Sequence, residues 1–188
     1  MSTEIIIALV SSITALIIAI LTTLLKTPAE KKIERLRHEL KQEELIIEAD
    51  RQRKSQVLDA LDHAISLIQE FKDVLQRILL SAETSLDSDL AVEMIKKAQT
   101  KLTNEYRDRT AHLHKPDNDL FHTAKGIGFQ VESIITTELR HKEYASDLCE
   151  DSKRDLQVFR AQLTEIQDVL RDSQSRALMQ YLQPIGAK

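Results

Sequence analysis

The sequence predicts an all-α protein with three consecutive parts: an N-terminal membrane-spanning helix, a coiled-coil stalk and an antiparallel bundle of about four helices. Three observations support this fold class. The chain has only 3 Gly and 3 Pro in 188 residues, which is typical of long helices with few connections. A long apolar run without charge opens the chain, and a seven-residue repeat of apolar positions follows it.

The apolar run from Ile5 to Leu25 contains no charged side chain. At about 1.5 Å per residue it covers roughly 31 Å, close to the ~30 Å hydrocarbon core of a bilayer. A buried helix of a soluble protein would carry a polar stripe, and a cleaved signal peptide would have a basic start and a shorter apolar region. The run is therefore predicted to be a retained signal anchor that crosses the membrane once.

The flanks of the apolar run predict its orientation. Residues 1–4 include Glu4 and no basic side chain, whereas several basic residues follow the run, namely Lys26, Lys31, Lys32, Arg35 and Arg37. Positive residues stay on the cytoplasmic side of a membrane. We therefore expect residues 1–4 outside and the rest of the chain in the cytoplasm, where the same basic residues can contact anionic lipid head groups.

One face of the predicted span carries small residues at i, i+4 spacing: Ser11, Ala15, Ala19 and Thr23. Such a stripe lets two membrane helices approach closely, so we interpret it as a seam for self-association. Ala, Ser and Thr are also common in membrane helices, and a chance alignment is the alternative interpretation.

Residues 26–56 are predicted to form the stalk. A seven-residue register starts at Ile33 and continues to Ile78, well into the next part of the chain. In the stalk its apolar members form a narrow stripe, which we call the stalk stripe: Ile33, Leu36, Leu40 and Ile47. We expect the stalk stripe to mediate self-association. Glu43, Asp50 and Lys54 interrupt the register, and they either set the pairing of two helices or belong to a solvated single helix.

Residues 57–182 are predicted to form the cytoplasmic bundle, and residues 183–188 a tail. Leu58, Ile65 and Leu79 widen the apolar stripe into a face of bundle type. The polar stretches at residues 81–89, 114–119 and 141–146 are the predicted connections. They separate three further helices with these apolar faces: Ala91, Met94, Ile95, Ala98 and Leu102; Leu120, Ala124, Ile127, Val131 and Ile134; and Cys149, Leu156, Phe159, Leu163, Ile166, Leu170 and Ala177.

Imidazole and carboxylate side chains, which are common metal ligands, gather near the second of these connections: His112, His114, Asp117, Asp119 and His122. Their spacing matches no standard zinc pattern, and Asp is an ordinary residue of a Pro-containing turn. The sequence therefore predicts no metal site and no cofactor, with His112, His114 and His122 as the alternative candidates for ligands.

The stretch from Tyr106 to His114 reads YRDRTAHLH, in which Arg107 and Asp108 precede His112. It is similar to the Arg-x4–6-His motif of the HEPN superfamily, a group of all-helical bundles that includes metal-independent ribonucleases. The resemblance implies that Arg107 holds the scissile phosphate and that His112 serves acid/base chemistry at a dimer interface, with Asp108 beside them. Pro116 departs from the family pattern, in which helix usually continues past the His.

The sequence favours a non-enzymatic function. It contains no Gly-rich phosphate loop, Gly-x-Ser-x-Gly elbow or His-Glu-x-x-His motif, and a net charge of −4 with mixed signs gives no general field for nucleic acid. We expect a single-pass membrane scaffold, tether or sensor that forms homo-oligomers and presents its bundle to a cytoplasmic protein. The alternatives are a membrane-tethered HEPN-like ribonuclease that uses Arg107 and His112, and an oligomerising effector that permeabilises the bilayer.

Overall fold

The computed structural model describes residues 3–83, 86–104 and 112–182, without the side chains of residues 3–9, 23, 25–29 and 82–83. The α-helices in these ranges are α1 (Thr3–Leu79), α2 (Ser88–Asn104), α4 (Lys115–Leu139) and α5 (Glu150–Leu182). Two short 3-10 helices, η1 (Leu80–Glu83) and η2 (Ala145–Asp147), lie in the connections. The described part of the chain contains no β-strand, and the predicted all-α class is confirmed.

The chain divides into two compact units, Met1–Asp50 and Arg51–Lys188, and α1 contributes residues to both. In the first unit the described side chains are exposed, apart from Ile47 and Asp50, which are half-buried. The sequence predicted a break around Pro28, but α1 continues through this position. Residues 29–50 are rich in Leu, Glu, Lys and Arg, and residues 3–50 contain no Gly, so helix propensity after Pro28 favours continuation.

The residues that the structure describes include no helix with the length and apolarity needed to cross a membrane. The predicted transmembrane segment Ile5–Leu25 is therefore not supported by the structure.

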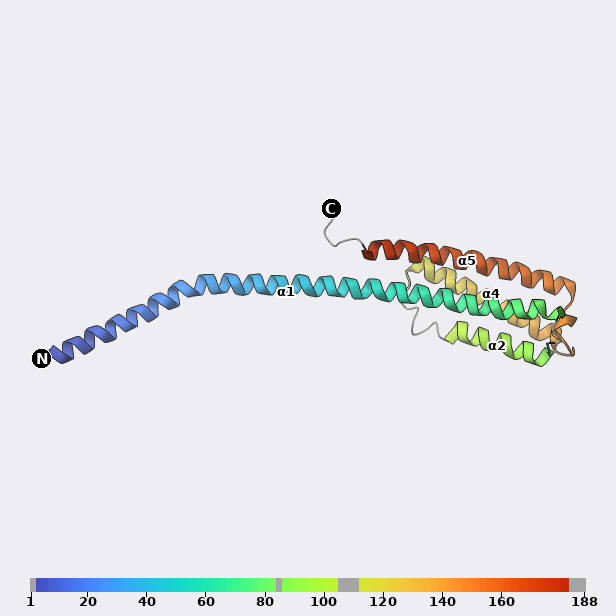
Figure 1. Cartoon of the computed structure of the whole chain (residues 1–188), viewed down its shortest axis with the longest axis horizontal. Coiled ribbons are helices and arrows are strands. Elements are labelled where there is room, and N and C mark those ends of the chain that lie inside the picture. The colour runs from blue at the N-terminus through green and yellow to red at the C-terminus, as the bar shows by residue number, and fades with distance from the viewer. Residues whose placement is uncertain (1–2, 84–85, 105–111, 183–188) are drawn as a thin grey trace. The chain divides into compact units, whose positions relative to one another are not determined.

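The second unit is a helical bundle in which α2, α4 and α5 pack beside the C-terminal part of α1 (Figure 1). The heptad positions of α1, which are exposed in the first unit, are buried in the core of this unit. Leu61, Ala64, Ile68, Phe71, Leu75 and Ile78 are all at most 1% exposed. Burying one such large apolar side chain stabilises a fold by about 1.5–3 kcal/mol, so this face of α1 contributes strongly to the stability of the bundle.

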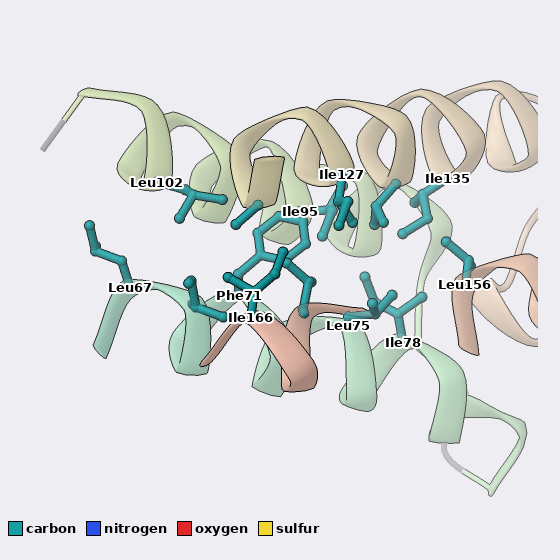
Figure 2. Close-up of a cluster of buried hydrophobic side chains, with 14 of the residues drawn as sticks. Leu67, Phe71, Leu75, Ile78, Ile95, Leu102, Ile127, Ile135, Leu156 and Ile166 are labelled. Carbon is teal, nitrogen blue, oxygen red and sulfur yellow. The ribbon is translucent and has the colours of Figure 1, made fainter. Parts of the chain in front are cut away.

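The other three helices supply the facing side of the same core. Figure 2 shows Ile95 and Leu102 of α2, Ile127 and Ile135 of α4, and Leu156 and Ile166 of α5 directed toward Phe71 and its neighbours on α1. Most of the predicted apolar faces are thus buried. On α4 the predicted Ala124, Ile127 and Val131 are buried, whereas the predicted Leu120 and Ile134 are half-buried beside Phe121 and Ile135, which are fully buried.

Backbone hydrogen bonds join two connections at one end of the bundle. The amide of Ala145 donates to the carbonyl of Leu86 at 2.8 Å, and the amide of Ser88 donates to the carbonyl of Glu143 at 3.1 Å. The connection after α1 and the connection after α4 therefore lie side by side. Successive helices must then run in opposite directions, as an antiparallel bundle requires.

The starts of α4 and α5 differ from the predicted ones. α4 begins at Lys115, so the predicted turn at residues 114–119 is wrong beyond His114, because Pro116 occupies the first helical turn, where its missing N–H is tolerated. Cys149 was expected to be a buried residue within the last helix. It is exposed and precedes α5, and its carbonyl accepts the amide of Lys153 at 2.9 Å.

Gly128 lies where α4 approaches α2 closely. A Cβ atom at this position would lie 2.1 Å from Oε1 of Gln99 and 3.2 Å from Cδ2 of Leu102. Gln99 is 2% exposed, and its amide nitrogen donates to Oγ1 of Thr103 at 3.2 Å and to the carbonyl of Lys125 at 3.5 Å. The Gln99 side chain is held on both sides, so it has little room to move away from a larger residue.

Two glycines of α4 should therefore respond oppositely to the same substitution. We expect Gly128→Ala to lower the free energy of unfolding by about 1–3 kcal/mol, because the added methyl group overpacks the α2–α4 contact. Gly126→Ala should raise it by about 0.5–1 kcal/mol, because a Cβ there meets nothing within 4 Å and Ala is the better helix former. Urea unfolding followed by circular dichroism measures both, and equal effects of the two substitutions would contradict the close contact.

Candidate functional site

The residues of the HEPN-like resemblance are only partly described. Arg107 and Asp108 lie outside the described residues, while His112 is exposed just before α4. The proximity of Arg107 to His112, on which the ribonuclease alternative depends, therefore stays a prediction.

The three candidate metal ligands lie at the start of α4. His112, His114 and His122 are exposed, Asp119 is exposed, and Asp117 is buried in the first turn of α4. Within the described ranges, which include all five residues, no three His, Cys, Asp or Glu side chains come together in a group able to hold a metal ion.

The predicted self-association residues lie in the first unit. Ser11, Ala15 and Ala19 are exposed on α1, and the side chain of Thr23 lies outside the described residues. In the stalk stripe, Ile33, Leu36 and Leu40 are 52%, 49% and 59% exposed, and Ile47 is half-buried. The seven-residue register thus continues on α1 from the bundle into a region where its apolar side chains are in contact with solvent.

The apolar run itself is exposed around its whole circumference. Its described large side chains are all between 50% and 66% exposed: Val10, Ile13, Leu16, Ile17, Ile18, Ile20, Leu21 and Leu24. Two of the threonine hydroxyls in this region bond to the helix backbone. The hydroxyl of Thr14 donates to the carbonyl of Val10 at 2.7 Å, and the hydroxyl of Thr22 donates to the carbonyl of Ile18. Satisfying hydroxyls in this way makes them compatible with apolar surroundings.

A buried polar cluster joins α1 to α5 within the bundle. The ammonium of Lys72, on a side chain that is 8% exposed, donates to Oε1 of the fully buried Gln167 at 2.8 Å. The amide nitrogen of Gln167 donates in turn to the carbonyl of Ile65 and to Oε1 of Gln69, both at 3.1 Å. Both the oxygen and the nitrogen of the Gln167 side-chain amide thus have hydrogen-bond partners on α1. These bonds fix the axial position of α5 against α1.

Burial lowers the pKa of the Lys72 ammonium, and the cations Arg160 and Arg171 lower it further. The carboxylates of Asp168 and Asp73 act in the opposite direction but do not restore the ordinary value. A buried ammonium held by a neutral amide is a costly feature, because the amide of Gln167 offsets less of its desolvation than a carboxylate would. The contacts of Lys72 therefore specify how α1 and α5 align rather than maximise stability.

A shallow hollow of about 430 Å³ lies between α1 and α5. Its lining combines apolar and polar groups: Leu58, Asp59, Asp62, Gln174, Ser175 and Leu178. The amide of Gln174 donates to Oδ1 of Asp62 across it at 3.4 Å. From Leu178, which lines the hollow, to its end, α5 carries a group of exposed apolar side chains: Leu178, Met179, Tyr181 and Leu182.

Cys149 caps the start of α5 with its side chain. The amide of Ser152 donates to Sγ at 3.4 Å, and the Cys149 thiol donates to Oγ of Ser152 at 3.2 Å. The Cys149 side chain lowers the pKa of the nearby Glu138 carboxyl. The ammonium of Lys142, 3.4 Å from Glu138, lowers that pKa as well. These contacts connect the end of α4 to the start of α5.

No family model, curated protein or solved structure matches this chain.

The Lys72–Gln167 pair should show strong coupling in a double-mutant cycle. We expect Gln167→Leu alone to lower the free energy of unfolding by about 2–4 kcal/mol, because it leaves a buried ammonium without its acceptor. Lys72→Met alone should cost less, since it leaves only a neutral amide oxygen without a donor. The double variant should regain most of the lost stability, because no buried polar group of the pair remains. Additive losses in urea unfolding would contradict the pairing.

The pH dependence gives this cycle a second readout. A depressed pKa means that the unfolded chain holds the Lys72 proton at a pH where the folded chain has begun to release it. Stability should therefore rise as pH increases through the window below the ordinary lysine value of 10.5. The difference in unfolding free energy between the native chain and Lys72→Met isolates this contribution from other titrating groups. The stability advantage of the native chain over Lys72→Met should grow from pH 7 toward pH 10, whereas a constant difference would contradict a depressed pKa.

Proposed function

We propose that this protein is a single-pass membrane scaffold in which α1 anchors the chain and carries the bundle on its cytoplasmic side. The proposal rests on the change in burial of apolar side chains along α1. The same helix and the same register have buried apolar side chains from Val57 onward and exposed ones before Ile47. The exposed part requires an environment that the single chain does not supply.

The apolar run supports a bilayer as the environment of the first exposed part. Ile5–Leu25 has no charge, and its described apolar side chains are exposed on all sides of α1, so one partner protein could cover only part of it. A helix that is apolar all round is typical of a membrane span or of the centre of a large protein. At ~1.5 Å per residue its length fits the hydrocarbon core.

The charge distribution supports an orientation with the bundle in the cytoplasm. All 26 Lys and Arg residues lie at or beyond Lys26, and the closest follow the apolar run directly. Because basic residues near a span stay on the cytoplasmic side, the bundle would be presented there. The small side chains of Ser11, Ala15 and Ala19 on one face support association between copies within the membrane.

Membrane anchoring is tested by cell fractionation of the full chain. We expect the protein in the carbonate-resistant membrane pellet. The variant Ile17→Arg/Ile18→Arg should move to the supernatant, because each Arg at the centre of a span costs roughly 2.5–3.5 kcal/mol of insertion free energy. The matched control Ile17→Leu/Ile18→Leu should remain in the pellet. A native chain in the supernatant would exclude the anchor.

Association through the small-residue face is tested by the mass of the detergent-solubilised full chain, measured by light scattering. We expect a multimer for the native chain and a smaller species for Ala15→Leu/Ala19→Leu, because larger side chains keep two helices apart. The control Ile13→Leu/Ile20→Leu conserves volume away from these positions and should leave the mass unchanged. A native monomer would exclude self-association, and equal loss in both variants would exclude a specific face.

A further inference from the structure

Three of the four side chains of the stalk stripe, Ile33, Leu36 and Leu40, are exposed on α1, and charged residues flank them. In the register defined by Ile33 and Leu36, the positions that flank the seam are Lys32 and Arg37 in the first heptad and Glu39 and Glu44 in the second. All four side chains are exposed. Flanking positions of this kind set which helices pair, because they meet the flanking residues of the partner helix.

These charges disfavour a second copy as the partner of the stalk stripe. In a parallel pair of copies, Lys32 of one helix would face Arg37 of the other, and Glu39 would face Glu44. Glu43, at a seam position, would face its own copy. Every one of these contacts joins like charges. Parallel orientation itself rests on the proposed function, because two copies anchored in one membrane enter the cytoplasm from the same side.

We propose that the stalk stripe binds a helix of complementary charge, contributed by a different protein. That helix would present apolar residues to Ile33, Leu36, Leu40 and Ile47. It would carry acidic side chains opposite Lys32 and Arg37, and basic side chains opposite Glu39, Glu43 and Glu44. The stalk then recruits a partner helix, while contacts between copies are confined to the apolar run.

The alternation of charge along the stalk also favours a protein partner over a lipid surface. An anionic membrane would attract Lys32 and Arg37 but repel the carboxylates of Glu39, Glu43 and Glu44 one to two turns later on the same helix. A helix with an acidic first heptad and a basic second heptad complements the whole sequence of charges. Charge complementarity therefore favours a helical protein partner.

The test compares two fluorescent peptides for binding to the full-length protein in neutral detergent micelles. The first peptide has the sequence of residues 31–50. The second is a charge-inverted copy with Lys32→Glu, Arg37→Glu, Glu39→Lys, Glu43→Lys and Glu44→Lys, which keeps the apolar seam. We expect the charge-inverted peptide to bind with a Kd at least about tenfold lower, because several exposed ion pairs replace several like-charge contacts. Fluorescence anisotropy measures both affinities.

Two variants of the full-length protein provide the controls. The same five substitutions placed in the protein should reverse the preference, so that the peptide of native sequence binds tighter. Leu36→Ser/Leu40→Ser should abolish binding of the charge-inverted peptide, because it removes the centre of the seam. Both sets of substitutions lie on exposed positions before the bundle, so circular dichroism and thermal unfolding should show an intact bundle. Raising the salt to roughly 1 M should reduce the preference, because charges are then screened beyond ~3 Å.

Three results would overturn the proposal. Equal or tighter binding of the native-sequence peptide would assign the stalk stripe to a second copy. The absence of binding by both peptides up to millimolar concentration would exclude a helical partner. Loss of peptide binding in micelles that contain phosphatidylserine would assign the stripe to an anionic lipid surface. Detergent keeps the full chain in solution whether or not it crosses a bilayer, so failure of this preference is distinguishable from failure of membrane anchoring.

Discussion

Every helix of the bundle depends on the same line of α1 side chains for its burial. Leu61, Ile68 and Leu75 alternate with Ala64, Phe71 and Ile78, and α2, α4 and α5 each place apolar residues against this line. None of the three could bury its apolar face alone, because each has only one. The seven-residue register of α1 therefore provides the surface against which the other three helices bury their apolar faces.

Burial alone would leave the helices free to slide, and polar contacts limit this freedom. Gln167 accepts from Lys72 and donates to Ile65 and Gln69, so α5 can satisfy these groups at one axial position only. Gly128 has a similar effect between α4 and α2, since the Gln99 side chain fits only where a Cβ is missing. Both contacts are less favourable than apolar packing would be, and both select one arrangement among several of comparable burial.

The sequence predicts the parts of this structure that follow from periodicity. The part of the register from Val57 to Ile78, the bundle core and the connection around residues 141–146 all arise from the spacing of apolar residues and turn formers, and they are confirmed. The pairing of the stalk from Ile33 to Ile47 stays a prediction. The start of α4 was predicted too late because Pro is common both in loops and in the first turn of a helix, and Pro116 was read as part of a loop. Cys149 was misplaced because its spacing fits the face of α5, although the helix begins one residue later. The polar cluster at Lys72 leaves no periodic signal, since a Lys and a Gln at these positions also fit a solvated surface.

The hydrogen bonds between the connections at Leu86 and Ala145 have a consequence for motion. They tie the ends of α1 and α4 to the starts of α2 and α5, so four helix termini are held together at one end of the bundle. At the other end α5 finishes in exposed apolar residues that begin at the hollow near Leu58. Local opening requires less free energy where fewer buried contacts must break. Amide protons near the end of α5 should therefore exchange with solvent before those near Ser88. The bundle then opens from one preferred end, and α5 separates from α1 progressively from its C-terminus.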